Sequence, residues 1–146
     1  MTHPTGNGPL SLEKHPAHLG LGATTIPQPE FTRQMDWYMD YGRRHGADGP
    51  DGRLLSMHTF DQSWDSWEMH PHGSEVVIVT AGELTLVQEK DGIETRVELL
   101  AGEYAINQPG VWHTADVDGV VTAVFITSGE GTQQRPRIAP SPATTN

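Results

Sequence analysis

Residues 66–82 read SWEMHPHGSEVVIVTAG, and this stretch decides the fold. Side chains alternate between the two faces of a β-strand, so a regular strand over 64–72 places every second residue on one face. The residues that share this face are Ser66, Glu68, His70 and His72. A β-branched run then begins at Glu75 and predicts a second strand that ends at Gly82. Two histidines one residue apart, followed by a glutamate, outline a metal site.

Further short strands are expected on both sides of this stretch. Asp91 and Gly92 lie between two alternating runs, which is a strong signal for a β-hairpin. A preceding helix is expected over 31–44, where aromatic and apolar residues recur at steps of three and four. The expected strands are 53–60, 84–89, 94–99, 104–106 and 120–127. Short strands separated by glycine and aspartate turns predict an all-β sandwich or barrel.

The length of 146 residues predicts one domain with a single core. Residues 1–28 are rich in Gly, Pro, Thr and His without periodicity, and we expect an N-terminal arm there. The domain and its preceding helix are expected over 29–128. Residues 129–146 are polar and rich in proline, which predicts a flexible C-terminal tail.

Composition excludes several classes of function. The sequence has no cysteine, so disulfide scaffolds, thiolate metal sites and cysteine nucleophiles are excluded. The net charge of −10 argues against binding to nucleic acid or to an anionic membrane surface. No apolar run approaches the ~20 residues of a membrane-spanning helix, and the first residues lack the pattern of a signal peptide. We therefore expect a cytoplasmic protein.

Two spaced motifs resemble those of the cupin superfamily, in particular its small single-domain members. The first motif, G(x)5-H-x-H-(x)3,4-E-(x)6-G, is similar to the residues from His70 to Gly82. The second, G-(x)5-P-x-G-(x)2-H-(x)3-N, is similar to the stretch that begins at Gly102 and contains His113 in register. Four positions depart from the motifs: Trp64, the two-residue link Gly73 and Ser74, Gln108 and Val117.

The resemblance implies a cupin-type β-barrel, of the jelly-roll or double-stranded β-helix kind, with one N-terminal helix and loose termini. It also implies that one divalent transition metal is held by His70, His72, Glu75 and His113. The link before Glu75 is shorter than the motif allows, so Glu75 is the least secure of these ligands. Imidazole and carboxylate ligands suit Fe(II), which we favour, and also Zn, Mn or Ni.

The surroundings of the metal should form a mostly apolar pocket for a small molecule. We expect His58, Tyr104 and Trp112 to line it. Glu68 shares a strand face with His70, which makes it a candidate general base or a hydrogen-bond partner of a metal ligand. A salt bridge at the rim of the barrel is the alternative role for Glu68.

The fold does not select the reaction, because cupins carry many different activities. We favour a metal-dependent enzyme that acts on a small organic molecule, as a mononuclear non-haem Fe(II) dioxygenase. One alternative is a non-redox isomerase, cyclase or lyase in which the metal is a Lewis acid, and the other is a small-ligand-binding protein without turnover. A homodimer is expected, because a small open barrel has sheet edges to cover.

Overall fold

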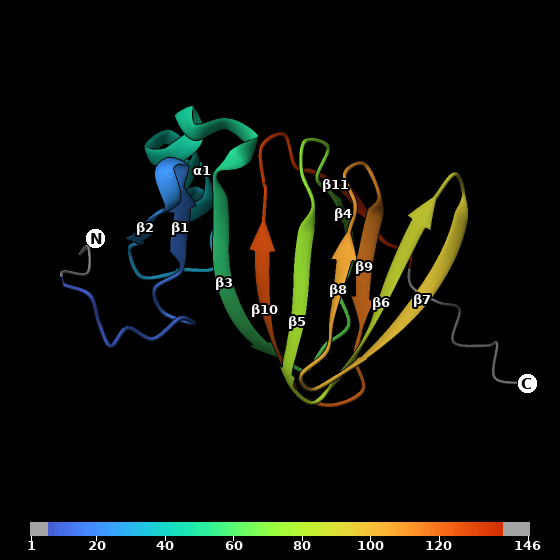
Figure 1. The fold of residues 1–146 in the computed structure, drawn as a ribbon. Helices are drawn as coiled ribbons and strands as arrows, with labels where there is room; N and C mark the ends of the chain where they lie inside the picture. Colours follow the sequence, from blue (N-terminus) through green and yellow to red (C-terminus); the bar gives the residue numbers. More distant parts are fainter. Residues whose placement is uncertain (1–5, 139–146) are drawn as a thin grey trace, which may run out of the picture.

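The computed structural model describes residues 6–138, which form two antiparallel β-sheets that pack against each other (Figure 1). The six-stranded sheet has the order β2-β1-β3-β10-β5-β8. Its strands are β1 (Ala17–Gly20), β2 (Thr24–Pro27), β3 (Arg53–Phe60), β5 (Glu75–Ala81), β8 (Tyr104–Asn107) and β10 (Val121–Thr127).

The five-stranded sheet has the order β11-β4-β9-β6-β7. Its strands are β4 (Ser66–Met69), β6 (Glu83–Lys90), β7 (Ile93–Leu100), β9 (Trp112–Asp116) and β11 (Gln133–Pro136). Consecutive strands therefore alternate between the two sheets at several points along the chain. This two-sheet, all-β architecture with one helix ahead of the main strands confirms the predicted fold class.

The hydrophobic core lies between the two sheets. Alternate residues of β5 and β10 point inward, and they meet the inward residues of β6, β7 and β9. The buried core residues are Val77, Val79, Leu84, Leu86, Leu99, Ala115, Val121, Ala123 and Phe125. Burial of this apolar surface is the main stabilising contribution to the fold.

The predicted hairpin joins β6 to β7. Lys90 pairs with Ile93, and the two residues between them have positive φ, 54° at Asp91 and 78° at Gly92. Such a two-residue turn matches the right-handed twist of the flanking strands, which is why Asp-Gly predicts it well.

Both ends of the chain contain more regular structure than the sequence indicates. In the expected arm, β1 pairs with β2 and with β3, so residues 17–27 extend the six-stranded sheet. In the expected tail, β11 pairs with β4 along its whole length. These strands are built by backbone hydrogen bonds to an open sheet edge, which do not require an alternating apolar pattern. The outer parts of the expected arm and tail, 1–5 and 139–146, lie outside the described residues.

Among residues 6–138 the one α-helix is α1 (Met35–His45), which lies beside β1 and the first residues of β3 (Figure 1). Trp37 anchors it: the ring is 1% exposed, and its Nε1 donates a hydrogen bond to the Pro29 carbonyl oxygen at 3.2 Å. Phe31 meets the Trp37 ring edge to face at a centroid distance of 5.1 Å. Among the described residues, no helix has the length and apolar character needed to cross a membrane.

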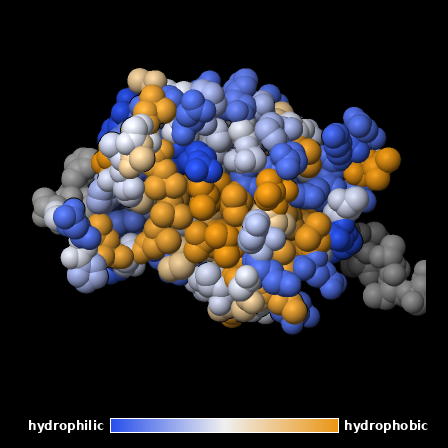
Figure 2. Space-filling model, in the orientation of Figure 1, coloured by the Kyte–Doolittle hydropathy of each residue, from blue (hydrophilic) through white to orange (hydrophobic). Residues whose placement is uncertain are grey.

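The outer face of the six-stranded sheet is apolar, and Figure 2 shows a continuous hydrophobic band on this side of the molecule. The band follows two rows of cross-strand neighbours on β3, β10, β5 and β8. One row is Leu55, Ile126, Val76 and Ile106, and the other is Met57, Val124, Ile78 and Tyr104. Tyr104 and Ile106 are exposed, at 63% and 43%.

Candidate metal centre

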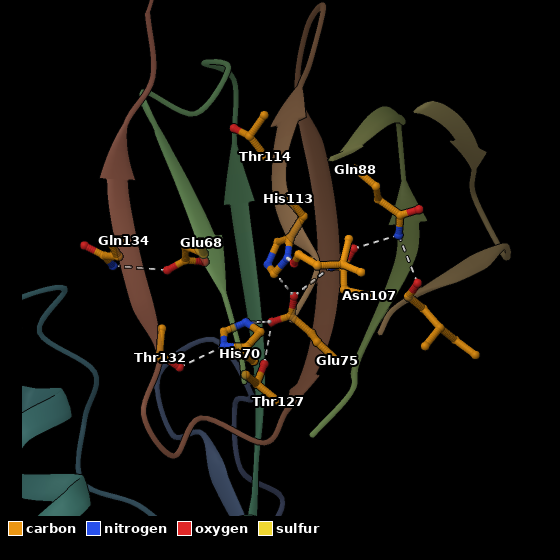
Figure 3. A network of polar contacts seen from close by, with 12 residues as sticks. Glu68, His70, Glu75, Gln88, Asn107, His113, Thr114, Thr127, Thr132 and Gln134 are labelled. Carbon is orange, nitrogen blue, oxygen red and sulfur yellow. Dashed lines mark hydrogen bonds and ion pairs between the residues drawn. The ribbon is translucent and has the colours of Figure 1, made fainter. Parts of the chain in front are cut away.

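Strands from both sheets bring the candidate ligands together at one end of the barrel (Figure 3). His70 follows the last residue of β4, and Glu75 is the first residue of β5. His113 lies on β9, directly opposite Glu68 of β4 in the ladder. The structure therefore brings together three of the four predicted ligands, and it adds Glu68 to them.

Glu75 lies at the centre of the group and is 4% exposed. Its neighbours in the ladder are Asn107 of β8 and Thr127 of β10. The Asn107 amide donates to Glu75 Oε1 at 3.0 Å, and the Thr127 hydroxyl donates to Oε2 at 2.6 Å. Gln88 Nε2 donates to Asn107 Oδ1 at 2.8 Å, which orients the Asn107 amide group toward Glu75. The buried Glu75 carboxylate thus accepts one hydrogen bond at each oxygen, and the Gln88 contact fixes which end of the Asn107 amide faces it.

Both histidine rings also contact this carboxylate. His113 Nε2 lies 3.1 Å from Glu75 Oε1, and His70 Nε2 lies 3.4 Å from Oε2. Burial acts to raise the pKa of Glu75, but the contacts with His113 and His70 outweigh it and hold the pKa well below its usual value. Burial likewise acts to lower the pKa of His113, but the Glu75 carboxylate outweighs it and raises that pKa. Glu75 is therefore an anion, and it favours positive charge in the space beside the two Nε2 atoms.

The Nδ1 atoms of both rings are already used as donors. His113 Nδ1 is 3.2 Å from the Val111 carbonyl oxygen, which can only accept. His70 Nδ1 is 2.8 Å from the Thr132 hydroxyl, which itself donates to the Gly129 carbonyl oxygen and so accepts from the ring. Each neutral ring therefore carries its proton on Nδ1 and a lone pair on Nε2, the arrangement of metal-binding histidines.

The Nε2 atoms of His70 and His113 are buried and have no hydrogen-bond partner among the described residues. The nearby Glu75 oxygens lie close enough for an ion pair but are not aligned for a hydrogen bond. Buried polar atoms are nearly always satisfied, so two adjacent orphaned nitrogens indicate a missing partner. A divalent cation is a partner that both lone pairs can share.

Glu68 completes a set that fits such a cation. One carboxylate oxygen of Glu68 and one ring nitrogen each of His70 and His113 lie within 4.8 Å of one another. Glu68 Oε2 also accepts a hydrogen bond from Gln134 Nε2 at 3.2 Å, which steadies the side chain. Two imidazoles and one carboxylate on one side of an open space form a mixed nitrogen and oxygen donor set with positions left for other ligands.

His72 lies outside this group. β4 ends at Met69, so the period-two alternation that would bring His72 onto the face of His70 is lost at Pro71. The His72 side chain is exposed and lies against Gly131, where a Cβ would be 3.4 Å from its Nε2. The structure thus places Glu68 where the motif resemblance implied His72.

A cavity of about 840 Å³ extends from the candidate metal centre to α1. Leu54, Trp64 and Phe125 supply apolar wall, and the candidate ligands Glu68, His70 and Glu75 lie at one end. The helix α1 contributes further residues to the cavity lining. These residues are Met35, Tyr38, Tyr41, Gly42 and His45. The size and mixed lining suit a small organic molecule.

The three residues expected to line the pocket have different positions. His58 lines the cavity, and burial lowers its pKa. Tyr104 instead lies on the outer face of the sheet, because it is one residue out of phase with the inward positions of β8. Trp112 lies outside the cavity lining, with the Arg135 guanidinium 4.5 Å from its ring centroid.

Sequence reasoning missed Tyr38 as a residue of the site. It lies on the cavity side of α1, and burial followed by the charges of Glu68 and Glu75 raises its pKa to about 12. Its hydroxyl therefore stays protonated and can donate a hydrogen bond to a molecule in the cavity. The periodic aromatic positions of α1 were the available signal, but periodicity alone does not tell a core face from a cavity wall.

No protein-family model matches this sequence, and no curated protein matches it significantly. Solved structures similar in fold include a double-stranded β-helix protein from Klebsiella pneumoniae subsp. pneumoniae, with 24% identity over 58% of this chain and 76% of that one, at a TM-score of 0.48.

Two further structures have the same kind of similarity. A cupin-2 domain protein from Shewanella frigidimarina is 21% identical over 58% of this chain and 71% of that one, with a TM-score of 0.45. Oxalate oxidase in complex with the substrate analogue glycolate is 18% identical over 56% of this chain, with a TM-score of 0.49. This chain spans 45% of the length of that oxalate oxidase.

Proposed function

We propose that this protein is a mononuclear metal enzyme that acts on a small organic molecule in the cavity, with Fe(II) as the favoured metal and O₂ as co-substrate. One observation carries the proposal: the Nε2 atoms of His70 and His113 are buried, unpartnered and close to the Glu68 carboxylate. Two histidines and one carboxylate with open positions are the donor set typical of non-haem Fe(II) oxygenases.

When bound, the metal would supply open coordination positions at which a substrate and O₂ can meet. The residues of this chain have separate tasks around it. Thr132 and Val111 fix the tautomers of His70 and His113, and buried Glu75 supplies negative charge beside the Nε2 atoms of the two rings. Tyr38 offers a phenol donor to a bound molecule. The apolar wall formed by Trp64 and Phe125 excludes water from that space.

Metal binding is the first test. Protein purified without added metal should be analysed for its elements and then titrated anaerobically with Fe(II) or Co(II), while the d-d absorption of Co(II) is followed. We expect one equivalent to bind, and we expect His70→Ala, His113→Ala and Glu68→Gln each to weaken binding at least tenfold. The matched variant His72→Asn should bind like the wild type. Equal losses in His72→Asn and Glu68→Gln would contradict this ligand set.

Oxygen chemistry is the second test. O₂ consumption by the Fe(II)-loaded protein should be measured across small aromatic and thiol compounds, with the Zn(II)-loaded protein as control. Consumption that requires both Fe(II) and a substrate supports the oxygenase. Turnover that persists with Zn(II) under anaerobic conditions would assign the non-redox isomerase, cyclase or lyase instead. A molecule that binds tightly and is recovered unchanged would assign a binding protein.

A further inference from the structure

A second cluster of titratable residues lines the same cavity beside α1. His18 of β1 is 1% exposed, and both of its ring nitrogens have partners. Nδ1 lies 2.6 Å from the Tyr41 hydroxyl oxygen on α1, and Nε2 lies 2.7 Å from Asp48 Oδ2. Three groups that can exchange protons are thus joined in a row: Tyr41, His18 and Asp48.

The partners assign the protons in this row. The Asp48 carboxylate can only accept, so His18 Nε2 carries a hydrogen and donates it. The Tyr41 hydroxyl has no acceptor other than His18 Nδ1 among residues 6–138, so the phenol donates to that nitrogen. Burial, reinforced by the Asp48 charge, raises the pKa of Tyr41, which agrees with a phenol that keeps its proton at rest. In this arrangement His18 Nδ1 accepts from the Tyr41 phenol and Nε2 donates to Asp48.

The neighbouring histidine, His45, does not change this assignment of the protons. His45 stacks on His18 with ring centroids 4.0 Å apart and planes within 15°. Arg44 donates to Gln28 Oε1, so the opposite end of that amide, Nε2, donates to His45 Nε2 at 2.9 Å. His45 is thus held neutral with its proton on Nδ1, and burial lowers its pKa further. Asp48 is the charged group in contact with the His18 ring.

The backbone leaves space for the His18 and Asp48 pair and for little else. A Cβ on Gly52 would lie 2.9 Å from both His18 Cε1 and Asp48 Cβ. A Cβ on Gly20 would lie 3.1 Å from Asp48 Oδ2 and 3.3 Å from His18 Cδ2. Asp48 itself is 29% exposed, so the far end of the row reaches solvent while Tyr41 and His18 line the cavity.

We propose that Tyr41, His18 and Asp48 form a proton relay between the cavity and solvent, which deprotonates a substrate that carries a hydroxyl group or an enolisable C-H. The substrate proton passes to the Tyr41 oxygen as the phenol proton passes to His18 Nδ1. The Asp48 carboxylate stabilises the imidazolium that forms, and the proton on Nε2 leaves toward solvent through Asp48. The electron pair of the broken bond stays on the substrate, so no oxidant is needed. The relay depends on the proposed function in one respect, which is that the substrate binds in this cavity.

The relay can be tested without a metal or a substrate, so its failure is distinct from failure of the proposed function. A ring-fluorinated tyrosine at position 41 has a more acidic phenol of nearly the same size. We expect its proton to move to His18, seen as phenolate absorbance that appears together with the ¹⁵N shift of a doubly protonated His18. In Asp48→Asn the imidazolium loses its counter-charge, and the ratio of phenolate to phenol at pH 7 should fall at least tenfold.

Asp51→Asn is the matched control, because Asp51 lies in the same 3-10 segment (Gly46–Asp51) and is exposed. It should leave the phenolate ratio unchanged. Equal ratios in Asp48→Asn and Asp51→Asn would overturn the relay and leave these contacts a purely structural role. If Asp48→Asn does not fold, ¹⁵N spectra of the unmodified protein decide the question. His18 protonated only on Nε2 at pH 7 supports the relay, and protonation of both nitrogens overturns it.

Discussion

Replacement of Asn107 by Asp tests the buried centre of the candidate site with an almost isosteric change. Asn107 is 1% exposed, and its amide donates to the Glu75 carboxylate at 3.0 Å. In Asn107→Asp this donor becomes a second carboxylate facing the first. The Gln88 amide on the other side still has an acceptor, so the substitution changes mainly one contact.

The structure gives the size of the effect. Two unit charges 3.0 Å apart repel by about 5.5 kcal/mol at an effective dielectric constant of 20. Protonation of one carboxyl group avoids this repulsion and costs about 1.4 kcal/mol for each pH unit above a pKa near 3.9, or about 4 kcal/mol at pH 7. The second route is cheaper, so we expect Asn107→Asp to lose about 4 kcal/mol at pH 7 and only about 1.5 kcal/mol at pH 5.

Urea unfolding of the metal-free protein at pH 7 and pH 5 measures this difference. In the wild type the contribution of Glu75 to the free energy of unfolding should be the same at both pH values. The lowered pKa of Glu75 gives stability that is present above the unfolded-state pKa near 4.3 and is lost only as the pH falls below it. Asn7→Asp, the same change at an exposed residue, is the control and should have no measurable effect. If Asn107→Asp loses the same free energy at both pH values, Glu75 is not a buried anion and the reasoning is refuted.

Three other changes test separate features. Asp116→Asn should cost about 1 kcal/mol at pH 7 and progressively less as the pH falls below about 3.9, the pKa of a free Asp side chain, because the Arg137 contact holds the pKa of folded Asp116 below that value. Urea unfolding against pH measures this change. Gly82→Ala should cost about 2 kcal/mol more than Gly110→Ala in thermal unfolding, which is the usual cost of a steric clash in a core. Both glycines have φ near +80°, but only at Gly82 would a Cβ overlap backbone atoms. We propose that the apolar outer face of the six-stranded sheet joins two copies in a homodimer, so Val124→Glu should give a monomer in light scattering. A monomeric wild type would refute the homodimer.

The sequence predicted the strands well because their signals are local. Turn residues such as Asp91 and Gly92 and the alternation along β3 act within a few residues, and the structure reproduces them. The strands β1, β2 and β11 were missed because they are held by pairing to an existing edge. Pairing of this kind depends on the finished sheet, so a polar or proline-rich segment gives no sign of it in advance.

The sequence predicted a part of the candidate site, again where the signal is local. The sequence placed His70 and His113 in one site because their spacing matches the motifs. His72 was placed with them by strand alternation, which holds only while the strand lasts, and β4 ends one residue before His70. Glu68 joins the rings because β4 and β9 pair with Glu68 opposite His113. That register follows from the packing of the two sheets, which the sequence does not show.

The candidate metal ligands and the helical part of the cavity lining lie on different elements, which has a consequence for the evolution of the cavity. The candidate metal ligands come from β4, its following loop and β9, whereas Met35, Tyr38, Tyr41 and His45 are all side chains of α1. The helix is anchored mainly through Trp37, on residues that take no part in metal binding. Substitutions at cavity positions of this one helix, such as Met35, can therefore change which molecules fit the cavity while the candidate metal ligands stay the same.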